Sequence, residues 1–238
     1  MNRLTALFLM VSIFLLGSCK SNLFHKKEVV ENIPFSEDFN NIDVFHQNWK
    51  DNSFGHPKSY QLENNALKIT TRANSKDRIK VKTKRKNFGI GTYEWKIYVP
   101  QYNINDQCSI GAFIYHSGKT PYEIDFEIGS GTIADRTQVA AKPSEAIVHC
   151  TSQHHPHTSE IFKVATEQWH SFKIELIEND HKYFVKWYIN NILVKTLQTQ
   201  IKTKHKFTVH NSLENLSFMG EQLPTQENYV LFDSFSFK

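Results

Sequence analysis

Apolar and acidic side chains alternate strictly along Tyr122-Glu123-Ile124-Asp125-Phe126-Glu127-Ile128. A period of two is typical of a β-strand that turns one face to the core. The apolar residues would then enter the core, and the three carboxylates would share the opposite face. Acidic residues are depleted from strands and repel each other when stacked, so stability alone does not explain this face. The pattern favours a strand whose carboxylates have a chemical role.

The same alternation recurs before and after this strand. We expect strands at Ala66–Thr70, Ile79–Thr83, Tyr93–Val99, Phe172–Ile177, Tyr183–Ile189, Ile192–Leu197 and Tyr229–Phe237. The pair Asn190-Asn191 predicts a hairpin between two of them. We find no sustained helical period and no internal repeat. Many short strands separated by turns predict an all-β fold, a two-sheet β-sandwich or jelly roll.

The composition fits one large domain. The chain has 238 residues, of which 39% are hydrophobic and 13% aromatic, and its net charge is +4. These values exclude a disordered tail and a membrane protein with several spans. Lys and Arg are densest between Lys76 and Lys86. Such a stretch can attract nucleic acid or sulfated glycans, but a solvated strand face is the simpler interpretation, and we expect no nucleic acid partner.

The N-terminus has the features of an export signal. Arg3 precedes an apolar run, Leu7 to Leu16, that is too short to span a bilayer comfortably. Leu16-Gly17-Ser18-Cys19 resembles a bacterial lipobox. We therefore expect a lipoprotein signal peptide at 1–18, a lipid anchor at Cys19, a polar tether at 19–32 and the folded domain at 33–238. The alternative is an ordinary signal peptide with an incidental cysteine.

This leader predicts a location in the bacterial cell envelope. Lys20 follows Cys19, and no Asp stands there to indicate inner-membrane retention, so we expect the outer membrane, on either its periplasmic or its surface face. The compartment permits disulfides. Cys108 and Cys150 remain after the leader, and the sequence leaves open whether they pair.

Hydrolysis of a sugar bond needs two carboxyl groups, one as proton donor and one as nucleophile or base. The central acid of three can hydrogen-bond to a neighbour and separate the titrations of the other two. Without further context, an acidic solvent-facing strand is the simpler interpretation of Glu-x-Asp-x-Glu.

The flanking sequence favours a specific family. Glu123-Ile124-Asp125-Phe126-Glu127, with Gly129 after it, resembles the signature of glycoside hydrolase family 16 in the concanavalin A-like lectin/glucanase fold. Further motifs that resemble this family in order and spacing are Phe35–Phe39, Asn65–Ile69, Gly91–Ile97, Trp169–Phe172, Val185–Val194 and Phe232–Phe235. The resemblance implies a jelly roll with a glycan cleft on its concave sheet. It also implies endo-hydrolysis of a β-linked polysaccharide with retention, with Glu123 as nucleophile, Glu127 as acid/base and Asp125 as the assisting carboxylate.

The same resemblance suggests where sugar would be bound. The family usually has a Trp in the strand before the signature, where this chain has Ile114. Tyr115 and His116 are candidates to replace it, and Trp169 and His149 are further candidate sugar contacts. Trp95 shares a face with Ile97 and Val99 and is expected in the core.

We expect no metal and no cofactor. His149 belongs to a histidine cluster with His154, His155 and His157, but the spacing fits no standard ligand set. Asp233 resembles a residue that helps to hold a structural calcium in some members of the family, although an ordinary strand-end Asp is the simpler interpretation.

The expected partners are a polysaccharide substrate and the membrane, and a monomer is expected. Two alternatives to the hydrolase remain. The first is a non-catalytic carbohydrate-binding lipoprotein on the same fold, and the second is a structural envelope lipoprotein without a glycan ligand.

Overall fold

The computed structural model describes residues 33–55 and 58–238. The expected signal peptide, Cys19 and tether lie outside these residues. Within the described part, no helix is long and apolar enough to cross a membrane.

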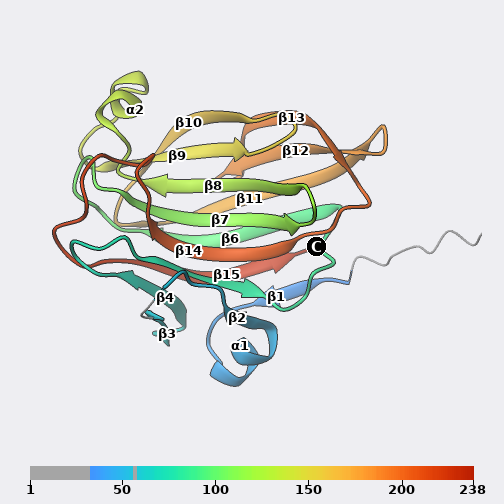
Figure 1. Cartoon of the computed structure of the whole chain (residues 1–238), viewed down its shortest axis with the longest axis horizontal. Helices are drawn as coiled ribbons and strands as arrows, with labels where there is room; N and C mark the ends of the chain where they lie inside the picture. The colour runs from blue at the N-terminus through green and yellow to red at the C-terminus, as the bar shows by residue number, and fades with distance from the viewer. Residues whose placement is uncertain (1–32, 56–57) are drawn as a thin grey trace, which may run out of the picture. The chain divides into compact units, whose positions relative to one another are not determined.

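Two antiparallel sheets form most of the fold (Figure 1). The eight-stranded sheet contains β1 (Phe35–Glu37), β3 (Tyr60–Glu63), β4 (Ala66–Thr71), β6 (Gly91–Val99), β11 (Gln168–Asn179), β12 (Lys182–Ile189), β13 (Ile192–Lys202) and β15 (Asn228–Phe237). The seven-stranded sheet has the order β10-β9-β8-β7-β14-β5-β2. Its strands are β2 (Trp49–Asp51), β5 (Arg78–Thr83), β7 (Cys108–Ser117), β8 (Pro121–Gly129), β9 (Glu145–Ser152), β10 (Thr158–Ala165) and β14 (Thr208–Asn215). The predicted all-β sandwich is therefore confirmed.

Each expected strand is present, most of them longer by a few residues. The predicted hairpin is also confirmed, since Ile189 pairs with Ile192 across Asn190 and Asn191. Both asparagines have positive φ, 50° and 64°, as a tight two-residue turn requires. Two short helices, α1 (Ile42–Asn48) and α2 (Ile133–Gln138), were not expected. Both are too short for a sustained helical period, and polar caps at Asn41 and Thr132 start them.

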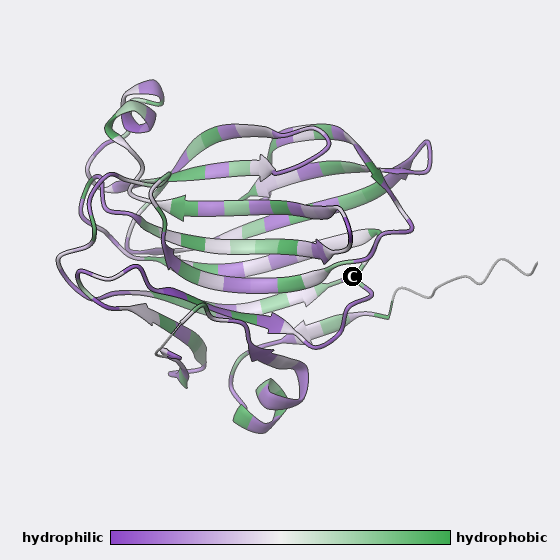
Figure 2. Ribbon diagram, viewed as in Figure 1, coloured by the Kyte–Doolittle hydropathy of each residue, from purple (hydrophilic) through white to green (hydrophobic). Residues whose placement is uncertain are grey.

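The core lies between the sheets, and hydrophobic and hydrophilic residues alternate along several strands, so that one face of each is buried there (Figure 2). Trp95 on β6 is fully buried, as expected, and its indole Nε1 donates to Asn211 Oδ1 of the other sheet at 2.9 Å. Trp187 on β12 is also buried and donates to the backbone oxygen of Asp125 at 3.0 Å. Two tryptophans of one sheet thus hydrogen-bond to the other sheet, and one of these bonds reaches β8.

The two cysteines of the described residues do not form a disulfide. Cys108 on β7 and Cys150 on β9 are both free and buried. They behave as small apolar core residues rather than as a cross-link.

Candidate active site

The centre of the candidate site is β8. Ile124, Phe126 and Ile128 are fully buried on its core face. The opposite face carries Glu123, Asp125 and Glu127, as the alternation predicts. Trp187 hydrogen-bonds to the backbone at Asp125, so a core residue of the other sheet holds the strand in place. The sequence pattern therefore places three carboxylates together on a strand that the core holds in position.

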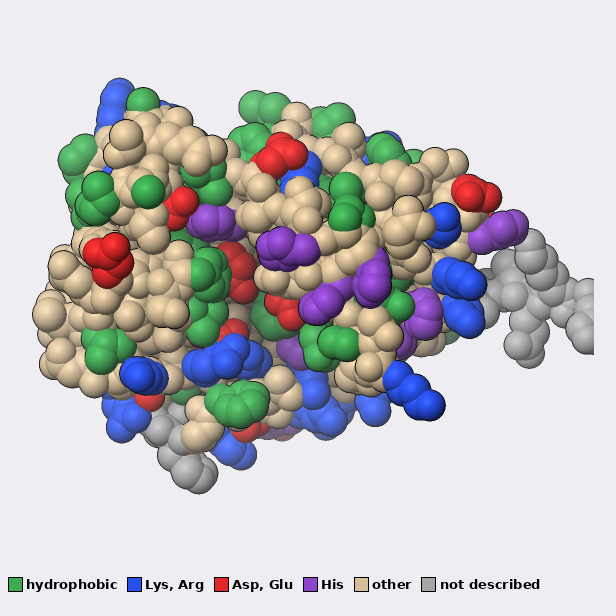
Figure 3. All heavy atoms as spheres, turned by 45° about the horizontal axis from the view of Figure 1, so that its top comes forward, with side chains coloured by type: hydrophobic (Ala, Val, Ile, Leu, Met, Phe, Trp, Pro, Cys, Tyr) green, Lys and Arg blue, Asp and Glu red, His purple; other side chains and the backbone are tan. Residues whose placement is uncertain are grey.

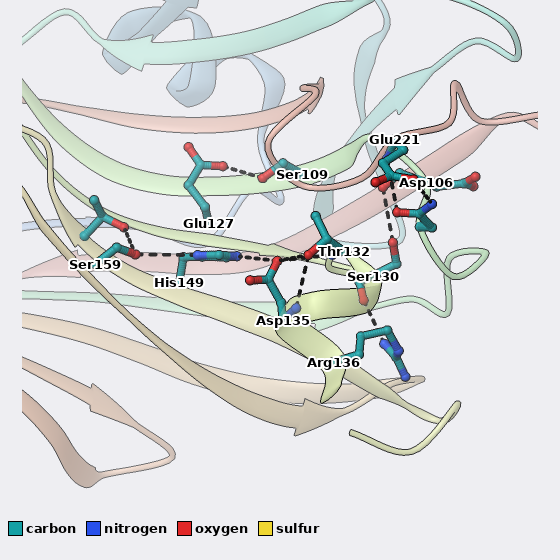
Figure 4. A network of polar contacts seen from close by, with 12 residues as sticks. Asp106, Ser109, Glu127, Ser130, Thr132, Asp135, Arg136, His149, Ser159 and Glu221 are labelled. Atoms are coloured by element: carbon teal, nitrogen blue, oxygen red, sulfur yellow. Dashed lines mark hydrogen bonds and ion pairs between the residues drawn. The ribbon is translucent and has the colours of Figure 1, made fainter. Parts of the chain in front are cut away.

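The three carboxylates differ in their surroundings. Glu123 and Glu127 line a cavity of about 600 Å³, whereas Asp125 is 0% exposed and does not line it. Gln153 donates to Asp125 Oδ2 at 3.1 Å, while Asp125 Oδ1 is buried without a hydrogen-bond partner among the described residues. Ser109 Oγ donates to Glu127 Oε2 (Figure 4). The two outer glutamates are thus open to a ligand, and the central aspartate is enclosed between them.

Burial changes the protonation of all three groups. Loss of solvation, with the added charge of Asp125, raises the pKa of Glu127 well above its ordinary value. Burial and the charge of Glu123 do the same to the pKa of Asp125. Burial also raises the pKa of Glu123, but only to about 7, because the charges of Lys80 and Arg78 partly offset the effect of burial. Glu123 is therefore the more readily ionised of the two cavity-lining acids.

The strands beside β8 form the rest of the cavity. Across from Glu127 on β7 stands Gly111, where a Cβ would lie 2.3 Å from Ser212 Oγ, so a larger residue does not fit. Across from Asp125 stands Phe113, whose ring stacks on His210 of β14 at 4.6 Å between centroids. Burial lowers the pKa of His210 well below its ordinary value, so this ring is neutral. A flat aromatic surface thus lies next to the carboxylates.

Cations line the far side of the same cavity. Lys80 on β5 donates to Glu214 Oε1 at 2.9 Å, and Arg78 also pairs with Glu214. The other lining cations are Lys50, Lys82 and Lys86. Figure 3 shows acidic side chains within a hollow of this face, with Lys and Arg along one edge and histidines along the other. The cavity therefore has an acidic floor and a basic edge.

The structure separates the four predicted sugar contacts. Tyr115 lines the cavity, opposite Glu123. His149 stands opposite Glu127 on β9, between Ser159 and Asp135 (Figure 4), and lines a neighbouring hollow of about 380 Å³. His116 and Trp169 are not brought to the cavity.

Strand direction and sheet assignment explain why His116 and Trp169 lie away from the cavity. His116 follows Tyr115 on β7, so its ring turns to the other face and stacks on Tyr122. Trp169 is 41% exposed on β11 of the other sheet, where it contacts Tyr98. Ile114, which stands where the family usually has a Trp, faces the core, and Phe113 takes the cleft side.

Sequence reasoning missed several cavity residues, among them Phe113, Lys80, Lys82, His210 and Glu214. The signal for Lys80 and Lys82 was present, since Arg78–Thr83 alternates strictly and one face of it is basic. That face was interpreted as solvated, but Lys80 is only 7% exposed. No local pattern marks Phe113 or His210, because their positions depend on strand pairing.

The described residues contain no group of three or more His, Cys, Asp or Glu side chains arranged to hold a metal ion. His154 and His155 lie in the connection between β9 and β10. Asp233 forms an ion pair with Lys96 at 3.3 Å.

Solved structures share this architecture. A β-glucanase from Bacillus licheniformis superposes with a TM-score of 0.60 at 15% identity, over 86% of this chain and 97% of that one. A laminarinase from Flavobacterium sp. UMI-01 has a TM-score of 0.62 at 17% identity, over 85% and 98%. A glycoside hydrolase family 16 endo-glucanase from Bacteroides ovatus has a TM-score of 0.57 at 14% identity, over 86% and 99%.

At these identities the likeness shows the fold, and it confirms the expected jelly-roll sandwich. No protein-family model matches the sequence, and no curated protein matches it.

Proposed function

We propose that this chain is a retaining endo-hydrolase of a β-linked polysaccharide, related to glycoside hydrolase family 16. The observation that carries the proposal is the placement of Glu123, Asp125 and Glu127 on one strand face, with the two glutamates lining an open cavity. Stacked, buried carboxylates with raised pKa values destabilise a fold, so a chemical role explains them better than a structural one. The glucanase names of the similar structures point the same way.

The protonation states assign the roles. Glu127 is the general acid, because burial and the charge of Asp125 raise its pKa well above its ordinary value and so favour the protonated form. Its proton passes to the glycosidic oxygen as the bond from that oxygen to the anomeric carbon breaks. Glu123 is the nucleophile, and its carboxylate forms a bond to the anomeric carbon. Lys80 and Arg78 favour the ionised form of Glu123 that this attack needs.

The second half of the reaction reverses these roles. Glu127, now ionised, takes a proton from water as the water oxygen attacks the anomeric carbon and releases Glu123. Two displacements on one carbon retain its configuration. Asp125 does not line the cavity, so its part is electrostatic: its charge raises the pKa of Glu127. Ser109 fixes the Glu127 carboxyl through its hydroxyl group.

The N-terminal sequence adds a location to the proposal. A lipobox ending at Cys19 would attach the enzyme to the bacterial envelope, in the outer membrane, through a lipid anchor. A monomer is then sufficient, because one chain supplies every group that the mechanism uses.

The test is an assay of new reducing ends on β-glucans, xyloglucan, agarose and carrageenan. We expect cleavage of at least one polymer by the unaltered chain, and none by Glu123→Gln or Glu127→Gln. Circular dichroism should give the same spectrum for all three proteins. Full activity in either variant would contradict the assignment of Glu123 and Glu127 as catalytic residues. Retention on a polymer without cleavage would instead support the carbohydrate-binding alternative.

A further inference from the structure

The basic edge of the cavity contains three lysines that the proposed reaction does not use. Lys82 on β5 pairs in register with Lys50 on β2, and both line the cavity together with Lys86. Like charges directly opposite each other on adjacent strands destabilise a sheet. The folded chain by itself therefore gains nothing from this arrangement.

These lysines differ from the other cations of the edge. Lys80 and Arg78 are both paired with Glu214, whose single carboxylate serves both. Among the described residues, Lys50, Lys82 and Lys86 form no ion pair with a carboxylate. Burial, together with the charges of Lys50 and Lys86, lowers the pKa of the half-buried Lys82. Solubility does not explain a lysine that is half-buried among other lysines.

A continuous row connects these lysines to the carboxylates. Strand pairing places Lys50, Lys82, His210, Phe113 and Asp125 side by side across β2, β5, β14, β7 and β8. Strands lie about 4.8 Å apart, so Lys82 is roughly 14 Å from the carboxylate strand. The stacked rings of Phe113 and His210 fill the interval. A glycan that crosses this row would bring a sugar some distance from the cleaved bond over the lysines.

We propose that the cleft binds an anionic glycan, with a sulfate or carboxylate substituent of one sugar held by Lys50, Lys82 and Lys86. The inference rests on the proposed function, because it takes this cavity as the substrate cleft. The anion removes the repulsion between the lysines and forms charge-assisted hydrogen bonds with them. Sulfate esters and uronate carboxylates share this chemistry.

The experiment measures binding separately from cleavage. The full-length chain carrying Glu127→Gln is run by affinity electrophoresis in gels containing κ-carrageenan, the same polymer after chemical desulfation, or chondroitin, which carries carboxylates without sulfate. We expect retardation by one or both anionic polymers, weaker retardation by the desulfated one, and a loss of affinity as NaCl is added. Preference for carrageenan identifies sulfate, and preference for chondroitin identifies the carboxylate.

Lysine variants in the same background assign the binding to the cluster. Lys50→Gln, Lys82→Gln and Lys86→Gln combined should weaken binding of the preferred polymer about tenfold or more, and should remove most of the salt dependence. Lys82→Arg, which keeps the charge, should retain most of the affinity. Lys76→Gln is the matched control, because Lys76 is exposed on the same basic stretch but does not line the cavity.

The outcomes separate this inference from the hydrolase proposal. Three results would each overturn the inference. The first is equal affinity for the sulfated and the desulfated polymer, together with no higher affinity for chondroitin. The others are unchanged binding by the triple variant and no binding to any of the three polymers. Cleavage of a neutral glucan by the unaltered chain, with the lysines irrelevant, overturns it while the hydrolase stands. Lysine-dependent binding without any cleavage supports it and contradicts the hydrolase.

Discussion

Glu127 and Glu175 are both glutamates that point away from the core on long antiparallel strands, yet their surroundings are opposite. Glu175 on β11 faces Lys186 across the sheet, with Lys186 Nζ at 3.1 Å and the Tyr188 hydroxyl donating at 2.9 Å. Partial burial alone would raise the pKa of Glu175, but these hydrogen bonds outweigh it and lower the pKa. Glu127 faces Gly111, which has no side chain, and His149, whose pKa is lowered by burial, and the pKa of Glu127 is raised.

The difference teaches that strand alternation by itself does not tell a catalytic acid from a surface one. The side chain opposite, on the neighbouring strand, decides whether the carboxylate forms an ion pair. A cation there gives a solvated ion pair, which contributes little stability and no chemistry. A glycine there, beside further acids, leaves a buried carboxyl without a counter-ion, and its pKa is raised.

The largest expected effect separates the two glutamates by activity. Glu127→Gln should lower kcat by about 10²–10⁴-fold, because the amide has no proton to give to the leaving oxygen. Glu175→Gln should stay within about twofold of the unaltered chain. Reducing-end kinetics on the polymer found to be cleaved measure both. Comparable losses in the two variants would contradict the proposed role of β8.

The pH profile gives the next effect. Glu123 attacks only when ionised, and its pKa is about 7. Below that pH, kcat/KM should fall about tenfold for each unit, since one proton must be lost. Glu214→Gln removes a charge that raises this pKa and frees Lys80 and Arg78. The acid limb of the profile should then move to lower pH. A profile that is flat from pH 5 to pH 8 would exclude Glu123 as the nucleophile.

Stability should change in the opposite direction to activity. The pKa of Glu127 is higher in the folded chain than in the unfolded one, so its contribution is favourable below the unfolded value and is lost as pH rises. Glu127→Gln has no such loss. At pH 8 it should raise the free energy of unfolding by about 0.5–2 kcal/mol, and near pH 4 the difference should vanish. Urea unfolding at both pH values measures this, and a destabilised variant at pH 8 would refute it.

The smallest effect belongs to Glu175. Its pair with Lys186 is partly exposed, so Glu175→Gln should cost about 0.2–1 kcal/mol at low salt. The cost should shrink in 1 M NaCl as the pair is screened. Urea unfolding at the two salt concentrations measures it. A cost larger than about 2 kcal/mol would mean that this ion pair is more than a surface contact.

Strand pairing explains which predictions needed the structure. Trp169 and His149 were equal candidates by sequence. The structure puts Trp169 on the eight-stranded sheet and His149 beside Glu127, because pairing between distant strands assigned their places. Tyr115 was found and Phe113 was not, although both face the cavity from β7. Phe113 became recognisable only through His210, which is far along the chain.

The sequence by itself determined the local period of β8 and therefore which side carries Glu123, Asp125 and Glu127. It also determined the Asn190-Asn191 hairpin, since both features depend on neighbours along the chain. Only the tertiary structure decided that Lys50, Lys82, His210 and Phe113 stand in one row with Asp125. A period of two fixes the face of a residue but not the strand beside it, because the burial of the whole core selects the pairing.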